Sequence, residues 1–261
     1  RWCLQFLAAC RSLRSAETTR HLLRLGHASR RLMHELLADD PALDFAHANS
    51  GKLVVYRDAA ALESARRQVD FQQRLVRDDD YRQEVLDRAA CMAIEPALDG
   101  LRGEIVGGVH TASEDTADCY RFSGELLDRI LAASPENRCF FATSINGLSV
   151  RQGEVVGVET SAGRLEADAY VLAAGCDSER LARRAGLSLP IYPLKGYSLT
   201  APISDPEAAP TLSVTDFQRK IVYARLAGRL RVAGIADIGG YDGSIAPRRL
   251  ATSTQSPISS P

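Results

Sequence analysis

Apolar positions recur at helical spacing over residues 2–38. The leucines that carry this pattern are Leu22, Leu25, Leu32 and Leu36. Their separations of three, seven and four residues place them on one face of a helix. Asp39-Asp40-Pro41 closes the pattern, because a proline and the residue before it rarely continue a helix. This stretch therefore predicts a long amphipathic helix.

Shorter strand and helix patterns follow. Continuous or alternating apolar residues are typical of strands, and Asp or Ser just before a helical segment is typical of an N-cap. The elements expected up to residue 133 are a strand at 52–56, a helix at 59–76 capped by Asp58, a helix at 81–90, a strand at 104–112, and a helix at 123–133 capped by Ser123.

The second half of the chain has the pattern of a β-meander, a helix and a hairpin. Gln152-Gly153, Ala162-Gly163 and Ala227-Gly228 are pairs typical of turns between antiparallel strands. The expected elements are strands at 140–145, 148–150, 155–158 and 169–174, a helix at 178–185 capped by Asp177 and ended by Gly186, and paired strands at 220–225 and 229–234. This order predicts α/β for one part of the chain and α+β for the rest, with their pieces alternating.

The composition fits a globular protein with a substantial core. The chain has 261 residues, of which 45% are hydrophobic, and a formal net charge of −1. Chains of this size bury roughly 70–75% of their unfolded surface. The neutral balance argues against a general nucleic-acid-binding protein. No apolar run approaches the roughly 20 residues of a membrane span, so no transmembrane segment is expected.

The cysteines and histidines give no metal-binding pattern. The six cysteines form no C-x-x-C pair, which favours reduced thiols in a cytoplasmic protein. His27 and His34 are seven residues apart and could share a helix face. Solvated or capping histidines are the favoured interpretation, because two imidazoles make a poor metal site without a carboxylate or thiolate. Asp78-Asp79-Asp80 is interpreted as a solvated loop, and no metal site is predicted.

The segment that begins at Ala167 carries the most informative chemistry. The apolar run 169–174 ends in Ala173-Ala174-Gly175, where small side chains would let a flat cofactor approach the backbone. A tightly packed strand-to-helix turn is the alternative. Proteins with such a strand usually also carry a Gly-rich phosphate loop, yet no G-x-G-x-x-G occurs in these residues.

The same region resembles the D-amino-acid dehydrogenases, which are FAD enzymes of the D-amino-acid oxidase and glycine oxidase superfamily. The block Ile191–Thr200, IYPLKGYSLT, is fairly specific to these dehydrogenases. The other matching segments are 95–98, 116–119, 167–171, 231–234 and 236–240. The resemblance covers about residues 2–250.

The resemblance implies a partial, Rossmann-like FAD-binding domain interleaved with an antiparallel-sheet substrate domain. It assigns 1–100 to a helical and substrate-domain segment, 101–190 to the FAD domain, 191–245 to the substrate domain and 246–261 to a disordered tail. The implied activity is oxidative deamination of D-amino acids, with hydride transfer from the α-carbon to FAD. The implied partners are a D-amino acid and a quinone or other electron acceptor, and the implied location is the cytoplasm or the periphery of the inner membrane.

The resemblance also suggests roles for particular residues. The backbone of Ile145 is expected to meet the adenine side of FAD, and Ala173, Ala174 and Gly175 to lie beside the cofactor; for Ile145 a core strand position is the alternative. Lys195 and Tyr197 are expected on a turn that approaches the flavin from the substrate side, with a plain surface turn as the alternative. No catalytic residue is identified, because an amine that loses its proton in solution needs no nearby base.

Three further residues are interpreted as structural. Asp118, beside Cys119, is favoured as an acceptor that orders its loop. Arg231 and Asp237 are favoured as pairing residues rather than catalytic ones.

Two other functions stay open. An oxidase of the glycine or sarcosine type would reduce oxygen instead of a quinone. The second open function is that of a non-catalytic remnant or binding module. The Gly-rich loop of the family and its last segment, which closes over the flavin, are both missing from these residues, so the sequence resembles the middle of such an enzyme. We accordingly expect this chain alone to lose FAD on desalting and to be poorly soluble.

Overall fold

The computed structural model describes residues 2–10, 12–75, 81–101 and 105–245. Asp78-Asp79-Asp80 and the tail 246–261 lie outside the described residues. The chain forms two compact units, each assembled from segments distant in sequence. Unit 1 comprises Arg1–Ala9, Arg129–Leu194 and Ile238–Asp242, and unit 2 comprises Cys10–Asp128, Lys195–Asp237 and Gly243–Pro261. A large mixed sheet and a second, antiparallel sheet confirm the expected mixed α/β and α+β class.

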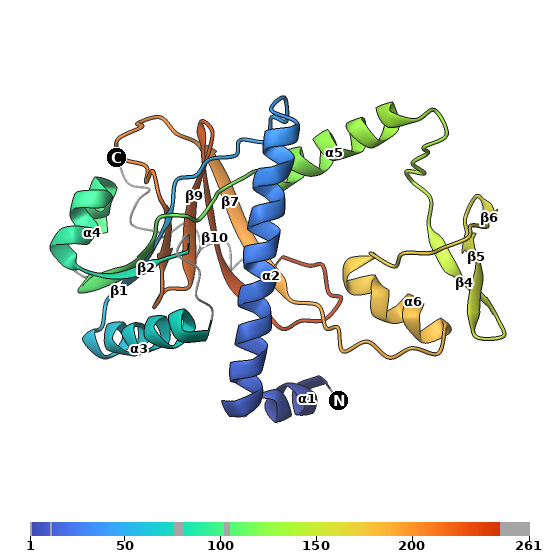
Figure 1. Ribbon diagram of the computed structural model, residues 1–261, viewed down its shortest axis with the longest axis horizontal. Helices are drawn as coiled ribbons and strands as arrows, with labels where there is room; N and C mark the ends of the chain where they lie inside the picture. Colours follow the sequence, from blue (N-terminus) through green and yellow to red (C-terminus); the bar gives the residue numbers. More distant parts are fainter. Residues whose placement is uncertain (1, 11, 76–80, 102–104, 246–261) are drawn as a thin grey trace. The chain divides into compact units, whose positions relative to one another are not determined.

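Unit 2 contains a seven-stranded sheet, drawn in Figure 1, and the order of its strands is β2-β3-β1-β8-β9-β10-β7. Its strands are β1 (Lys52–Tyr56), β2 (Gln83–Asp87), β3 (Gly107–Thr111), β7 (Lys195–Pro202), β8 (Ser213–Asp216), β9 (Ile221–Leu226) and β10 (Arg229–Asp237). β1 and β8 are parallel, and the other neighbouring strands are antiparallel. The predicted hairpin of β9 and β10 is confirmed, with Ala227 at a φ of 54° in its turn.

Short helices cover both faces of this sheet at its β2-β3-β1 end. On one face, α3 (Ala59–Leu75) buries Val69 against Tyr56 and Val109. On the other face, α4 (Arg88–Ile94) and the 3₁₀ helix η1 (Pro96–Leu101) bury Cys91 and Leu98 against the core around β1, β8 and β9. Each such aliphatic side chain contributes about 1.5–3 kcal/mol by leaving water.

The long N-terminal helix is only partly as predicted. The helical residues form α1 (Trp2–Ala9) in unit 1 and α2 (Ser12–Asp39) in unit 2. Leu22, Leu25 and Leu32 are exposed on α2 in the described structure. Among the helices of the described ranges, none is long and apolar enough to cross a bilayer.

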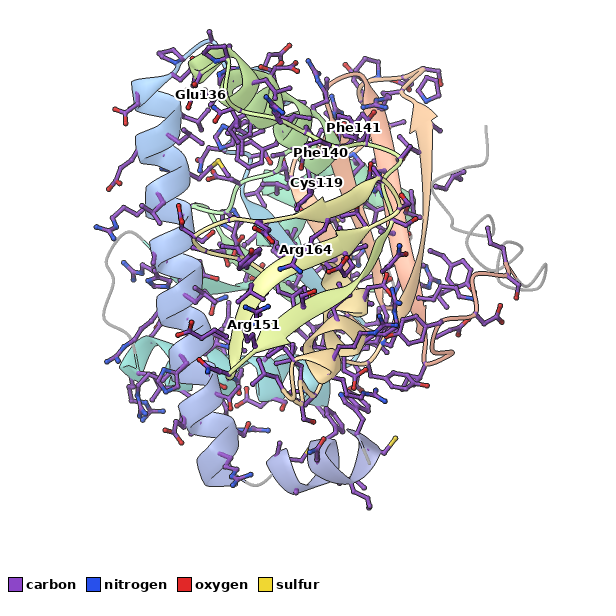
Figure 2. The ribbon with its side chains drawn as sticks, turned by 90° about the vertical axis from the view of Figure 1, so that its right-hand side faces the viewer. Cys119, Glu136, Phe140, Phe141, Arg151 and Arg164 are labelled. Atoms are coloured by element: carbon purple, nitrogen blue, oxygen red, sulfur yellow. The ribbon has the colours of Figure 1, made fainter. Side chains whose placement is uncertain are left out.

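Unit 1 holds a three-stranded antiparallel sheet and a short helix. The sheet consists of β4 (Ile145–Arg151), β5 (Glu154–Thr160) and β6 (Gly163–Leu165). Gln152 and Gly153 both have positive φ, as a two-residue hairpin turn requires. Arg164, labelled with Arg151 in Figure 2, lies 2.9 Å from Glu166 and 4.0 Å from Glu159. The helix is α6 (Ser178–Arg184), which follows the 3₁₀ turn η2 (Gly175–Asp177).

Four predicted elements are wrong or shifted. Residues 81–90 are not a helix: they hold β2 and the start of α4, because Gln83–Asp87 pairs with β3. The strand expected at 140–145 begins only at Ile145. The helix α5 (Cys119–Ala133) starts four residues before the expected Ser123. Residues 169–174 belong to no strand among the described residues.

Two helix caps also differ from expectation. Asp118, not Ser123, caps α5, since its Oδ1 accepts the amides of Tyr120 and Arg121. Asp177 precedes α6 without a side-chain capping hydrogen bond. Gly186 ends that helix with a φ of 77°, as predicted.

Candidate functional site

The residues expected to lie beside a cofactor form an exposed part of unit 1. Ala173 and Ala174 are exposed, and Gly175 has a φ of 55° with open space where a Cβ would stand. Val171, just before them, is 93% exposed. Ile145 lies at the edge of the small sheet with its side chain 37% exposed. The backbone at residues 173–175 is therefore accessible to a flat cofactor. That Ile145, Ala173, Ala174 and Gly175 contact FAD stays a prediction.

Lys195 and Tyr197 lie on a strand rather than on the predicted turn. Both belong to β7, which pairs with β10 along its whole length. The Tyr197 hydroxyl donates a 2.9 Å hydrogen bond to Oδ2 of Asp237. The Lys195 ammonium donates to the backbone carbonyl of Ser244 at 2.6 Å. The turn was expected because Pro193 and Gly196 flank this segment. The residues that pair with Lys195 and Tyr197 lie 42 and 37 residues downstream, so the local sequence did not show them.

A hollow of about 520 Å³ opens on the sheet of unit 2 where β7, β9 and β10 adjoin. Ser198, Val222 and Ala233 face it from three neighbouring strands in one register. Val222 pairs with Thr215 of β8, and Thr215 pairs with Val54 of β1, which packs beside α3. The hollow therefore lies on the same face of the sheet that α3 covers at the opposite end.

The charges around this hollow favour an anion. The residues that line it include Lys220 and Arg231, and no carboxylate is among them in the described structure. Arg231 donates to the Ser198 hydroxyl at 2.9 Å, and the Lys220 ammonium lies 3.6 Å from the centre of the Phe217 ring. Neither contact neutralises the cation, so both retain capacity for a carboxylate.

A β-bulge shapes one edge of the hollow. The pairing of β10 with β7 shifts between Gly234 and Ala236, and the inserted Ile235 has a φ of 56°. A Cβ on Gly234 would come within 2.8 Å of the Lys220 carbonyl oxygen, so only glycine fits this close approach. Lys220 and the bulge were not predicted as site features from the sequence. The Gly-Ile-Ala break in an otherwise regular strand pattern was the available signal.

The remaining candidate residues have structural contacts. Asp118 caps α5 and also accepts a 2.9 Å ion pair from Arg229, which agrees with the favoured loop-ordering role. The backbone amide of Arg121 lowers the pKa of Asp118 most, slight burial opposes this, and Tyr120 and Arg229 lower it further. Cys119 is exposed.

A second hollow, of about 550 Å³, lies within unit 1 between α1, α6 and the segment 186–193. Its wall includes Trp2, whose ring lies 5.5 Å from that of Tyr192. The charged residues on its wall, Glu179 and Arg183, pair with each other. This second hollow therefore has fewer unpaired charges to bind a charged substrate than the hollow on the unit 2 sheet.

The fold is that of a flavin-dependent oxidoreductase family. Residues 5–256 match the family described as FAD dependent oxidoreductase, and the chain belongs to that family. "D-amino acid dehydrogenase 2" of Ralstonia nicotianae is 44% identical over 97% of this chain and 59% of its own length. The Pseudomonas aeruginosa protein with the same name is 42% identical over 96% of this chain and 58% of its own length. The chain thus spans about three-fifths of these curated relatives.

Solved structures share the fold at low sequence identity. Glycine oxidase from Geobacillus kaustophilus has a TM-score of 0.73 and 20% identity, covering 88% of this chain and 62% of that chain. L-proline dehydrogenase from P. horikoshii has a TM-score of 0.72 and 16% identity, covering 86% and 59%. Both agree with the fold class predicted from the sequence.

Proposed function

We propose that this chain is part of a dehydrogenase that oxidises D-amino acids. The observation that carries the proposal is the 39–44% identity to relatives named D-amino acid dehydrogenase across at least 92% of the chain. The cationic hollow on the unit 2 sheet supports it, because an amino-acid substrate brings a carboxylate that needs such a partner.

In this proposal the hollow holds the substrate by its carboxylate. The Arg231 guanidinium offers two parallel N–H donors, and the Lys220 ammonium adds a second positive charge on the same rim. Tyr197 is also among the residues at the hollow, and its hydroxyl is held by Asp237. An exposed site leaves the amine to lose its proton to water, and no side chain needs to act as the base.

FAD would lie along the open segment of unit 1 that ends at Gly175. The small side chains of Ala173 and Ala174 and the positive φ of Gly175 fit the close approach of a planar ring or a ribose. When bound, FAD supplies the hydride acceptor. These residues would shape its contact surface, and Ile145 would contribute backbone at the edge of β4.

The first test is a visible absorption spectrum of the purified chain after incubation with FAD and desalting. Flavin bands that persist, and that bleach with D-alanine in the absence of air, would support the proposal. If the chain is colourless, the same test is made on a chimera in which residues 5–256 replace the matching part of the Ralstonia relative. A flavin-loaded chimera that D-amino acids do not reduce would contradict the proposal.

The electron acceptor separates this proposal from the glycine oxidase alternative. A dehydrogenase reduces a quinone analogue or a dye and consumes little oxygen, whereas an oxidase consumes oxygen without any added acceptor. Reduction of a quinone would also suggest transient contact with a membrane surface, and co-sedimentation with lipid vesicles tests that contact. Rapid oxygen consumption with glycine would favour the oxidase.

A further inference from the structure

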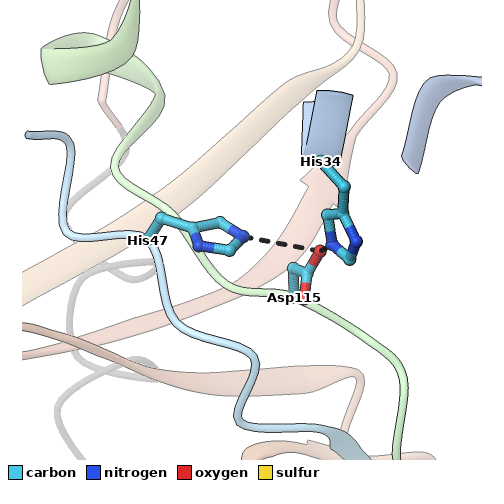
Figure 3. A group of neighbouring side chains, drawn as sticks. All are labelled: His34, His47 and Asp115. Atoms are coloured by element: carbon cyan, nitrogen blue, oxygen red, sulfur yellow. Dashed lines mark hydrogen bonds and ion pairs between the residues drawn. The ribbon is translucent and has the colours of Figure 1, made fainter. Parts of the chain in front are cut away.

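Three side chains from separate segments of unit 2 converge near the end of α2. They are His34 on α2, His47 on the segment that follows it, and Asp115 between β3 and α5 (Figure 3). One ligand atom from each lies within 4.8 Å of the others. The sequence alone gave His34 no carboxylate neighbour, because Asp115 is 81 residues away.

The distances are close to those of a metal site. His47 Nε2 lies 3.5 Å from Asp115 Oδ2, and His34 Nε2 lies 2.6 Å from the same oxygen. Ligands at about 2.0–2.1 Å from a tetrahedral ion are about 3.3–3.4 Å apart. The His47–Asp115 pair already has this spacing. The His34–Asp115 pair, now a hydrogen bond, needs to open by less than about 1 Å, which a small side-chain rotation provides.

The carboxylate is held in position from behind. The Asn49 side-chain amide donates to Oδ1 of Asp115 at 2.6 Å, which turns Oδ2 toward the two imidazoles. The backbones of Ala48 and Thr116 exchange two hydrogen bonds of 2.9 and 2.8 Å, so the segments that carry His47 and Asp115 are tied together. Partners behind a ligand that fix its orientation are typical of metal sites.

The environment leaves a coordinating nitrogen available. His47 Nε2 is shielded from solvent and makes no hydrogen bond with acceptable geometry. The buried Phe45 ring, 5.6 Å from the His47 ring, forms an apolar wall beside it. Burial of Asp115 acts to raise its pKa, but the hydrogen bond from Asn49 and the contacts with His34 and His47 outweigh this and lower it.

We propose that His34, His47 and Asp115 bind a divalent transition-metal ion such as Zn²⁺. The ion would coordinate Nε2 of both histidines and Oδ2 of Asp115, with water completing its coordination. The proton that now lies between His34 and Asp115 would move to Nδ1 or to solvent. Two imidazoles and one carboxylate suit zinc, copper or nickel better than magnesium or calcium, which prefer oxygen ligands alone.

The ion would fasten α2 to the sheet of unit 2. It would join α2 and the segment before β1 to the segment after β3, which is distant from both in sequence. Because a metal that binds only the folded state stabilises it by mass action, added Zn²⁺ should raise the melting temperature of the chain.

The test is calorimetric titration of the purified chain with ZnCl₂ after its accessible thiols are blocked with iodoacetamide. We expect one equivalent to bind, and His34→Gln, His47→Gln and Asp115→Asn each to weaken binding at least tenfold. His21→Gln is the matched control, because His21 is exposed on the same helix and its ion-pair partner is Glu17, at 3.8 Å. Melting in EDTA shows whether each variant is folded.

Two results would overturn the proposal. The first is that the double variant with His34→Gln and His47→Gln still binds one equivalent of Zn²⁺, with the same affinity as the control His21→Gln. The other is absence of Zn²⁺ binding by the folded wild-type chain, together with an unchanged melting temperature. A single variant that fails to melt cooperatively in EDTA is not folded, and the Co²⁺ absorption spectrum of the wild-type chain is then measured instead. Visible bands without thiolate charge transfer would support the site. The absence of bands would contradict it.

Discussion

One carboxylate oxygen of Glu95 accepts both the backbone amide and the hydroxyl of Thr211, at 2.7 and 3.0 Å. The same oxygen also accepts the amide of Leu212 at 2.8 Å. Glu95 is only 1% exposed, so its carboxyl oxygen is satisfied by these donors rather than by water. The contact joins the end of α4 to the residues that enter β8, across a sequence separation of 116.

Glu95→Ala should therefore lower the free energy of unfolding by about 3 kcal/mol, because it leaves several buried donors without an acceptor. Glu95→Gln keeps the shape and should cost about 1–2 kcal/mol. Urea denaturation at pH 7 measures both. The control is Glu63→Ala on the exposed side of α3, which should change stability by less than about 0.5 kcal/mol. An equal midpoint for Glu95→Ala and Glu63→Ala would show that the carboxylate does not hold α4 to β8.

Asp118 should give the chain a stability term that depends on pH. Its folded pKa is lowered, so its contribution is fully present above the ordinary carboxyl pKa of about 3.9 and is lost as pH falls through the lower folded value. Asp118→Asn keeps a capping oxygen for α5 but removes the ion pair with Arg229. Asp118→Ala removes both contacts, so its melting temperature at pH 7 should be the lower of the two.

The same variants give the pH test. The difference in melting temperature between the wild-type chain and Asp118→Asn should shrink as pH is lowered from 7 to about 3, below the ordinary carboxyl pKa. A difference that stays constant over this range would mean that charge on Asp118 does not contribute.

Cys91 should resist alkylation while the other cysteines react. It is fully buried between α4 and the sheet, and burial, with a smaller effect of Asp87, raises its pKa to about 11. The other five cysteines are exposed. Mass spectrometry after iodoacetamide treatment at pH 8 should show five adducts on the native chain and a sixth only after unfolding. Modification of Cys91 in the native chain would show that α4 opens readily.

The sequence predicted those elements whose signals are local. The hairpin of β9 and β10 has a two-residue turn between apolar runs, and β4 and β5 have another at Gln152-Gly153. β2 was mistaken for a helix because its Gln, Glu and Leu residues are good helix formers. β2 is a strand because it pairs with β3. The two strands approach so closely that a Cβ on Gly107 would come within 2.5 Å of the Leu86 carbonyl oxygen. The local sequence of β2 does not show this contact.

The candidate sites depend even more on distant contacts. Tyr197 was found by resemblance, but its partner Asp237 lies 40 residues further on. Lys220 enters the hollow only because β9 pairs with β10. Residues 169–174 had the continuous apolar pattern of a strand buried on both faces, yet that pattern does not specify a pairing partner, and none is present among the described residues.

Arg231 should control substrate affinity in the flavin-loaded chain or chimera. It lines the hollow from β10, and its contact with Ser198 leaves its charge available to a substrate carboxylate. Because a charge-assisted hydrogen bond contributes about 1.5–3 kcal/mol, Arg231→Met should raise KM for D-alanine roughly 10–100-fold and change kcat much less. Arg151→Met, at an exposed position of β4, is the control and should leave KM unchanged. The D-alanine methyl ester has no carboxylate, so wild type and Arg231→Met should oxidise it with similar KM. If Arg231→Met impairs the ester as much as the acid, Arg231 acts on the fold of the hollow and not on the carboxylate.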